Sequence, residues 1–322
     1  MTRRSTEPVF KNSQKCVGNV LNYLSDISGV KIVTGQHTQT MAMEEIETIK
    51  RVTGKEPALL GIELLSYSPN INYTDTDDEC MKEVLENNGT LKNAWLWAEK
   101  KGLITMTIHW FSPLGGRSKA FYTENTEFDA SLAVQSGTKE NKALLQDIDH
   151  FAALLRPFKE KGVPILWRPF HECDGEWFWW GAKGADVLKM LWRIMFERFT
   201  ATHGLDNLIW VWNAAKAEFY PGDDCVDIIS RDLYPAKHHH TANDKEYREL
   251  ISFTDAPKIA LMGETGILPD ADEIHDLHTG WTTYMTWSKD FCLTEEFNTF
   301  EYMKKLYDNP YAVTLDELPE LY

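Results

Sequence analysis

The chain has 322 residues, of which 43% are hydrophobic and 25% are charged, a composition typical of a folded globular protein rather than a disordered one. The formal net charge of −16 argues against nucleic acid as a partner, because phosphate backbones are bound by clustered Lys and Arg. The charge agrees with a neutral or cationic ligand, and equally with a role in solubility alone.

No apolar run reaches the roughly 20 residues that a membrane helix needs, so no membrane partner is expected. The five cysteines form no CxxC pair, which excludes a disulfide framework and a zinc knuckle but not a single disulfide. The N-terminal stretch MTRRSTEPVF has two arginines and no apolar segment behind them, so no signal peptide is visible. A cytoplasmic protein and an exported protein without its leader both agree with this.

Eight short apolar runs recur along the chain, and stretches with a helical pattern lie between them. Continuous apolar runs of strand length are typical of parallel strands that are buried on both faces. The helical stretches 42–54, 144–162 and 187–204 each end on a glycine, which is a common helix stop. The predicted strands are residues 30–36, 58–65, 102–110, 163–172, 207–213, 225–234, 258–266 and 280–288.

This alternation, without a linker or an internal repeat, predicts an α/β fold: a single (β/α)8 TIM barrel domain over residues 1–322. An open eight-stranded sheet is the alternative. In a barrel, the active residues lie just past the C-terminal ends of the strands. The polar and aromatic residues at those ends are His109, Trp110, Arg168, His171, Glu172, Trp212, Asn213, Asp232, Tyr234, Glu264 and Trp287.

Glu172 and Glu264 end the fourth and seventh predicted strands, which face each other obliquely across the mouth of an eight-stranded barrel. Two carboxylates on either side of one bond are typical of glycoside hydrolysis, with one as acid and the other as nucleophile or base. A separation of about 5 Å would indicate retention of configuration, and a wider one inversion. The alternative is that each glutamate only pairs with an arginine or lysine.

The neighbouring residues favour the catalytic interpretation. Arg168 is expected within the strand, on the same face as Phe170 and Glu172, where a guanidinium would keep a carboxylate ionised. Tyr234 is expected to donate to a carboxylate across the mouth. Burial among tryptophans is expected to raise the pKa of the acid, whereas hydrogen-bond donors are expected to keep the pKa of the nucleophile low.

The segment WRPFHECDGEWFWWG, residues 167–181, mixes flat rings with ionisable groups. Sugars present apolar faces and polar edges, so this mixture suits a carbohydrate site. Trp177 and Trp287 are expected to contact the ligand, with Trp110 and Trp212 at other parts of the rim, whereas packing explains Phe178 and Trp179 at least as well as contact. The stretches 238–240 and 75–79 lack the ligand spacing of a metal site, so neither metal nor cofactor is expected.

The same segment resembles the signature of glycoside hydrolase family 26, whose best-known members are endo-β-1,4-mannanases. Similar segments extend along nearly the whole chain: GQHT, KEPALLGIELLSY, TMTIHWFSP, YPGDDCVDIISRDLY, KIALMGETGILPD, YMTWSKDF and NPYAVTLDELP. The resemblance implies a (β/α)8 barrel that hydrolyses with retention of configuration, with Glu172 as acid/base and Glu264 as nucleophile. It also implies a cleavage subsite lined by His171, Trp177, Tyr234 and Trp287, with His109, Arg168 and Asp232 supporting them.

A β-mannan or manno-oligosaccharide is the substrate that the resemblance implies, and a monomer is expected. The family also contains lichenases and β-1,3-xylanases, which keeps mixed-linkage glucan and xylan as alternatives. A carbohydrate-binding barrel without catalysis is a remote alternative. Glu63 stands where many mannanases have Asp, and Ser288 stands where some members have a cation, so the specificity of the distal subsites stays open.

Overall fold

The computed structural model describes residues 4–39 and 42–322 of the chain. The predicted domain 1–322 also includes residues 1–3 and 40–41, which lie outside the described residues. Seven strands form one sheet in chain order, and each pairs in parallel with the next. These are β2 (Gly35–Thr38), β3 (Leu59–Glu63), β4 (Leu103–Thr107), β5 (Ile165–Trp167), β6 (Leu208–Asn213), β7 (Ile228–Leu233) and β8 (Ile259–Thr265).

The eighth predicted strand, residues 280–288, closes the barrel as a series of isolated parallel bridges rather than as a regular strand. Towards β2, the backbone N–H of Thr286 donates to the Gly35 carbonyl at 3.1 Å. Towards β8, the N–H of Trp287 donates to the Thr265 carbonyl at 2.9 Å. The segment therefore bonds to both edges of the sheet, and the (β/α)8 prediction is confirmed.

The first predicted strand, residues 30–36, is split in the structure. Its first part forms β1 (Ile32–Val33), which pairs with β9 (Ala312–Val313) in a separate two-stranded sheet, and the barrel strand β2 begins only at Gly35. Backbone crowding explains the glycine, because a Cβ atom there would lie 2.2 Å from the carbonyl oxygen of Tyr284. Only a residue without a side chain lets the closing segment approach β2 so closely.

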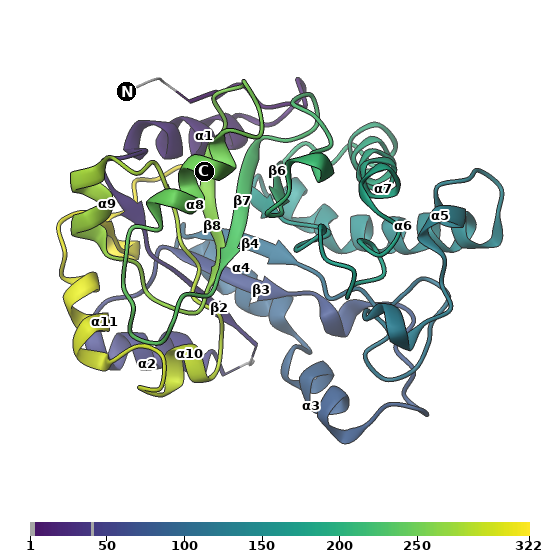
Figure 1. The fold of residues 1–322 in the computed structure, drawn as a ribbon, viewed down its shortest axis with the longest axis horizontal. Coiled ribbons are helices and arrows are strands. Elements are labelled where there is room, and N and C mark those ends of the chain that lie inside the picture. The colour runs from purple at the N-terminus through teal and green to yellow at the C-terminus, as the bar shows by residue number, and fades with distance from the viewer. Residues whose placement is uncertain (1–3, 40–41) are drawn as a thin grey trace.

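The helices lie around the outside of the strands (Figure 1). All three helical stretches predicted above are present, as α2 (Glu44–Thr53), α6 (Lys139–Glu160) and α7 (Ala185–Glu197). Helix α6 begins earlier than predicted because the Thr138 hydroxyl caps it, accepting from the N–H of Asn141 at 3.0 Å. The other helices are α1 (Lys15–Ile27), α3 (Asp78–Glu86), α4 (Thr90–Glu99), α5 (Ala130–Ala133), α8 (Asp244–Ile251), α9 (Ala271–Leu277), α10 (Asp290–Leu293) and α11 (Phe300–Tyr307). No helix in the described part of the chain is both long and apolar enough to cross a membrane.

The barrel interior changes from apolar to polar along the strands. Near the start of the strands, the inward residues form one buried cluster with α1, which covers that end. Further along the same faces, polar side chains take over at the C-terminal end. The apolar residues are Leu59, Leu103, Leu166, Ile209, Ile228 and Ile259, and the polar ones include Glu63, Thr107, Asn213 and Asp232.

Candidate active site

Three carboxylates from three parts of the sheet meet at the C-terminal end of the barrel. Glu172 follows β5, Asp232 lies on β7, and Glu264 lies on β8. One oxygen from each carboxylate lies within 4.8 Å of the other two. The fold therefore brings Glu172 and Glu264 together, although 92 positions separate them in the sequence, since 264 minus 172 is 92.

An irregularity between β7 and β8 places Glu264 beside Asp232. Arg231 pairs with Met262, but Asp232 pairs with Glu264, so the register shifts by one residue at Gly263. A Cβ atom at Gly263 would lie only 2.7 Å from an oxygen of Asp232, so a side chain does not fit here. The bulge re-aims the following side chain into the site, which is a common role of bulges near active sites.

Arg168 binds two of the three carboxylates from below. Its guanidinium donates to both oxygens of Asp232, at 3.1 and 3.3 Å, and also to Oε1 of Glu264. Arg168 is 1% exposed, so the two ion pairs are shielded from water. Two carboxylates share one fixed positive charge, which favours their ionised forms.

The predicted orientation of Arg168 relative to Phe170 and Glu172 is wrong. β5 ends at Trp167, and both Phe170 and Glu172 have left-handed backbone conformations, with φ of 52° and 48°. Side-chain alternation ends with the extended backbone, so it does not apply beyond Trp167. Phe170 is buried against the ring of Trp110 instead of facing the carboxylates.

The second oxygen of Glu264 is also bound. The Tyr234 hydroxyl donates to Oε2 of Glu264 at 2.9 Å, which confirms the predicted donor across the mouth. Burial, followed by the charge of Glu264, raises the pKa of Tyr234 and keeps the phenol protonated as a donor. Both oxygens of Glu264 thus accept hydrogen bonds and hold a fixed orientation.

Glu172 lies in a different environment. Its Oε2 accepts from the indole N–H of Trp177 at 3.1 Å, and its backbone N–H donates to Asn213 at 2.7 Å. Burial, followed by the negative charge of Glu264, raises the pKa of Glu172. A carboxyl group with a raised pKa can stay protonated near neutral pH and act as an acid.

Two histidines and a buried glutamate form a chain beside the carboxylates. Glu63 accepts from the backbone N–H of His109 at 2.7 Å and lies 2.8 Å from its Nδ1. His109 Nε2 lies 3.3 Å from His171 Nε2, and His171 Nδ1 lies 3.0 Å from the Thr107 hydroxyl. Because that hydroxyl donates to the carbonyl of Arg168 at 3.0 Å, it accepts from His171 Nδ1.

The hydrogen-bond pattern assigns the protons of this chain. His171 Nε2 is then the acceptor, and His109 donates from both ring nitrogens, which makes it a cation. Burial alone would lower the pKa of His109, but the Glu63 carboxylate outweighs burial and the net shift is upward. Burial, followed by the charge of His109, lowers the pKa of His171 well below its usual range. Both shifts agree with a charged His109 and a neutral His171.

The aromatic residues divide into exposed and buried groups. Trp177 is 50% exposed beside Glu172, and the partly exposed ring of Trp287 stacks on His37 with centroids 4.0 Å apart. Phe178 and Trp179 are buried, in agreement with the packing interpretation of the sequence. Trp177 and Trp287 are thus the two tryptophans of the rim that offer ring surface near the carboxylates.

Two other tryptophans that the sequence placed at the rim are not part of the site. Trp110 is 2% exposed, donates from its indole N–H to Asp147 at 2.8 Å, and packs on Phe151 of α6. Trp212 is fully buried and packs on Tyr220, because its neighbour on β6 takes the inward position. The predicted ligand contact of Trp110 is therefore corrected to a structural role under the rim.

The sequence analysis did not identify Glu63 or His37 as site residues. Both are fully buried, and they lie on β3 and β2 at inward positions near the C-terminal end of the barrel. Neither ring nitrogen of His37 has a hydrogen-bond partner among the described residues. The available signal was their position, since inward alternation places a polar residue at the end of a barrel strand in the site.

The chain also matches a known family along its length. The profile of glycosyl hydrolase family 26 matches residues 9–317. The chain belongs to glycosyl hydrolase family 26. Its sequence is 36% identical over 302 residues to a mannan endo-1,4-beta-mannosidase from Thermothelomyces thermophilus, a match that covers 92% of this chain and 60% of that protein.

Solved structures agree with this membership. A beta-(1,4)-mannanase from Podospora anserina has a TM-score of 0.89 and 33% identity, with 99% of this chain and 70% of that chain covered. A beta-mannanase from a symbiotic protist of the termite Reticulitermes speratus, solved with a gluco-manno-oligosaccharide, also has a TM-score of 0.89, with 32% identity and 99% of both chains covered. The barrel of this family 26 chain is therefore that of solved mannanases.

The carboxylate triad of this family 26 chain does not fit a resident metal ion. Carboxylate oxygens can coordinate hard cations such as Ca²⁺ or Mg²⁺. The guanidinium of Arg168 already donates to Asp232 and Glu264, and its positive charge would repel a cation placed between them. The donor set fits an acid and a nucleophile better than a metal centre.

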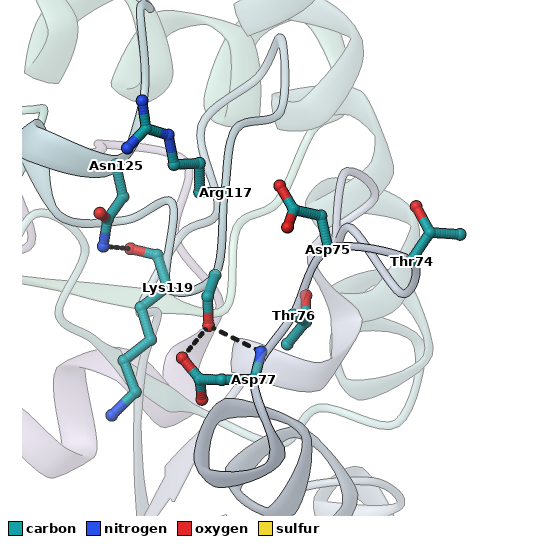
Figure 2. A pocket seen from close by; sticks show the side chains of 8 residues that line it. Thr74, Asp75, Thr76, Asp77, Arg117, Lys119 and Asn125 are labelled. Carbon is teal, nitrogen blue, oxygen red and sulfur yellow. Dashed lines mark hydrogen bonds between the residues drawn. The ribbon is translucent and has the colours of Figure 1, made fainter.

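A separate polar hollow of about 490 Å³ lies on the same side of the barrel (Figure 2). Residues 74–77, after β3, and residues 117–125, after β4, form its walls. Ser118 joins the two loops by donating to Asp77 at 2.6 Å, as Figure 2 shows. No predicted site residue lines this hollow, so it is distinct from the carboxylate site.

Proposed function

We propose that this chain hydrolyses β-1,4-mannosidic bonds in mannans and manno-oligosaccharides with retention of configuration. The observation that carries the proposal is the distance between Glu172 and Glu264, whose nearest oxygens lie within 4.8 Å. Retaining glycosidases keep their two carboxyl groups about 5–5.5 Å apart, whereas inverting enzymes need about 6.5–9.5 Å to fit a water molecule. The narrow gap supports direct attack by one carboxylate.

Glu264 is the proposed nucleophile, and Glu172 is the proposed acid/base. Arg168 and Tyr234 hold Glu264 and favour its ionised form, so that it can attack the anomeric carbon. Glu172, with its raised pKa, protonates the glycosidic oxygen of the leaving sugar. The product of this step is a covalent glycosyl-enzyme.

The charge of Glu264 supports the second step. Its negative charge raises the pKa of Glu172 in the free enzyme. Once Glu264 becomes an ester, that charge is lost and the pKa of Glu172 falls, which suits removal of a proton from the attacking water. One residue can therefore act first as an acid and then as a base.

Substrate contacts are proposed for the residues that surround the two glutamates. The exposed rings of Trp177 and Trp287 supply apolar surfaces for sugar faces. His109, His171 and Tyr234 supply polar groups, and Arg168 and Asp232 fix the carboxylates; these assignments follow the contacts described above. The proposal also takes residues 1–322 as one catalytic domain that acts as a monomer, because every site residue comes from this chain.

Activity assays on Glu264→Ala test the assignment. Turnover of mannan should fall about 10³-fold or more, the scale on which loss of a catalytic nucleophile acts. Glu176→Ala is the matched control, because Glu176 is exposed in the same segment and outside the carboxylate site. Residual hydrolysis within about tenfold of the parent would contradict the nucleophile role.

Two further measurements test the stereochemistry and the substrate. Proton NMR of the first product should show the β-anomer before mutarotation, and an initial α-anomer would contradict retention. Assays on mannan, mixed-linkage β-glucan and xylan, run side by side, compare the three polymers that the family resemblance leaves open. The highest kcat/KM is expected on mannan. Binding without product release from any polymer would instead indicate a carbohydrate-binding barrel.

A further inference from the structure

A polar hollow of about 430 Å³ adjoins the carboxylates on the side of α8. The end of β7, the loop that follows it and the first turn of α8 line the hollow. Helix α8 lies beside β7 and β8 (Figure 1). Small-molecule sites in proteins have volumes of about 300–1,000 Å³, so this hollow is large enough for a ligand.

This hollow joins a smaller one at the proposed cleavage site. The smaller hollow, of about 150 Å³, lies against Glu172 and Trp177, and it shares Arg231 and Asp232 with the larger one. The acid Glu172 must lie next to the oxygen of the leaving sugar, so the leaving sugar occupies the smaller hollow. The larger hollow is then where the next ring on the leaving side would lie.

The walls of the larger hollow offer polar groups that are not used elsewhere. His239 lines the hollow, and its imidazole has no partner in the described part of the chain; the same holds for the carboxylate of Glu246. Arg231, in contrast, is held by Glu249 at 2.6 Å and forms a fixed part of the wall. Sugar hydroxyls both donate and accept, so a free imidazole and a free carboxylate suit them.

The loop that carries His239 is held in place before any ligand arrives. The N–H of Ala242 donates to Glu273 at 2.6 Å, and its carbonyl accepts from the indole of Trp281 at 3.0 Å. A wall that is already ordered loses little entropy on binding. We therefore propose that this hollow binds a second hexose ring on the leaving-group side of the scissile bond, with His239 and Glu246 as specificity-determining contacts. The inference rests on the proposed function.

The experiment compares the double variant His239→Ala/Glu246→Gln with the parent. Lys245→Ala is the matched control, because Lys245 is exposed on the same helix and does not line the hollow. Three substrates are assayed: an aryl β-mannobioside, linear mannopentaose labelled at its reducing end, and a manno-oligosaccharide with galactosyl branches. The aryl leaving group is a single ring and does not reach the larger hollow.

We expect the double variant to retain the parental kcat/KM on the aryl glycoside. On mannopentaose, kcat/KM should fall about tenfold, the loss expected for hydrogen bonds with polar or charged side chains. The labelled products should also shift away from cleavage that leaves two sugars on the reducing side, a change that a merely structural defect would not cause. A loss confined to the branched substrate would identify the bound ring as a branch and would also support the proposal.

Parental rates and parental product ratios on all three substrates would overturn the assignment of this hollow while leaving the proposed function intact. A loss of similar size on the aryl glycoside would also overturn it, because the variant would then disturb the cleavage site itself. If the parent cleaves none of the three substrates, the proposed function fails, and the inference fails with it. The control variant should match the parent in every assay.

Discussion

Asp147 of α6 is a buried carboxyl group that forms no ion pair among the described residues. It is 4% exposed and accepts from the indole of Trp110 at 2.8 Å and from the amide of Asn70 at 3.1 and 3.2 Å. Burial raises the pKa of Asp147 to about 7, and these two donors offset burial only in part. The substitution Asp147→Asn replaces the titrating group by a neutral one of similar shape.

The sign of the effect follows from the raised pKa. Between about pH 4 and pH 7 the folded protein keeps the proton that the unfolded chain releases, so the free energy of unfolding falls as the pH rises through this window. Each pKa unit corresponds to about 1.4 kcal/mol, and the shift from 3.8 to about 7 therefore corresponds to about 4 kcal/mol. The Asn variant cannot make this contribution, because an amide does not titrate.

Urea unfolding at a series of pH values measures the effect. The parent should lose about 4 kcal/mol relative to Asp147→Asn between about pH 4 and pH 8. Asp26→Asn is the control, because Asp26 is exposed on α1, and its difference from the parent should stay nearly flat. Parallel curves for the parent and Asp147→Asn would refute the reasoning, since they would show that Asp147 titrates alike in the folded and unfolded states.

Three substitutions in the site have equally definite outcomes. Tyr234→Phe removes the donor to Glu264, so kcat should fall about 10- to 100-fold in mannan assays, with little change in thermal stability. Trp177→Phe removes the donor that lowers the pKa of Glu172; the alkaline limb of the pH profile of kcat/KM should move to higher pH, and kcat/KM should fall about tenfold. Arg168→Met leaves Glu264 buried without its cation, so urea titration should show a loss of about 3–5 kcal/mol of stability, and an unchanged stability would contradict the charge arrangement described above.

The sequence predicts the barrel because period and burial coincide along its strands. In β3, every residue from Leu59 to Glu63 is buried, which gives the continuous run expected of a parallel strand. The eighth segment also appears in the sequence as apolar, although its backbone bonds only at isolated positions. Apolar patterning reports burial, whereas regular pairing also depends on bulges and close approaches such as the one at Gly35.

Prediction of the site succeeds on the strands and fails beyond them. Asp232 and Glu264 lie within β7 and β8, and both reach the site as their strand positions indicate. Past the end of β5, left-handed residues such as Phe170 direct the side chains, and no sequence period records them. Trp110, in the loop after β4, turns under the rim for the same reason and binds Asp147.

The distribution of one positive charge explains how similar carboxyl groups can take different roles. Arg168 contacts Asp232 and Glu264 but does not donate to Glu172, so Glu172 lies near two ionised groups without a hydrogen-bonded cation of its own. Repulsion from Glu264 adds to the effect of burial, and both favour the protonated form of Glu172. The same residue that fixes the nucleophile therefore also keeps the acid protonated, because it holds the charge of Glu264 close to Glu172. A chain that lost Arg168 would lose both properties together, which makes this arginine a positioning residue for two steps of one reaction.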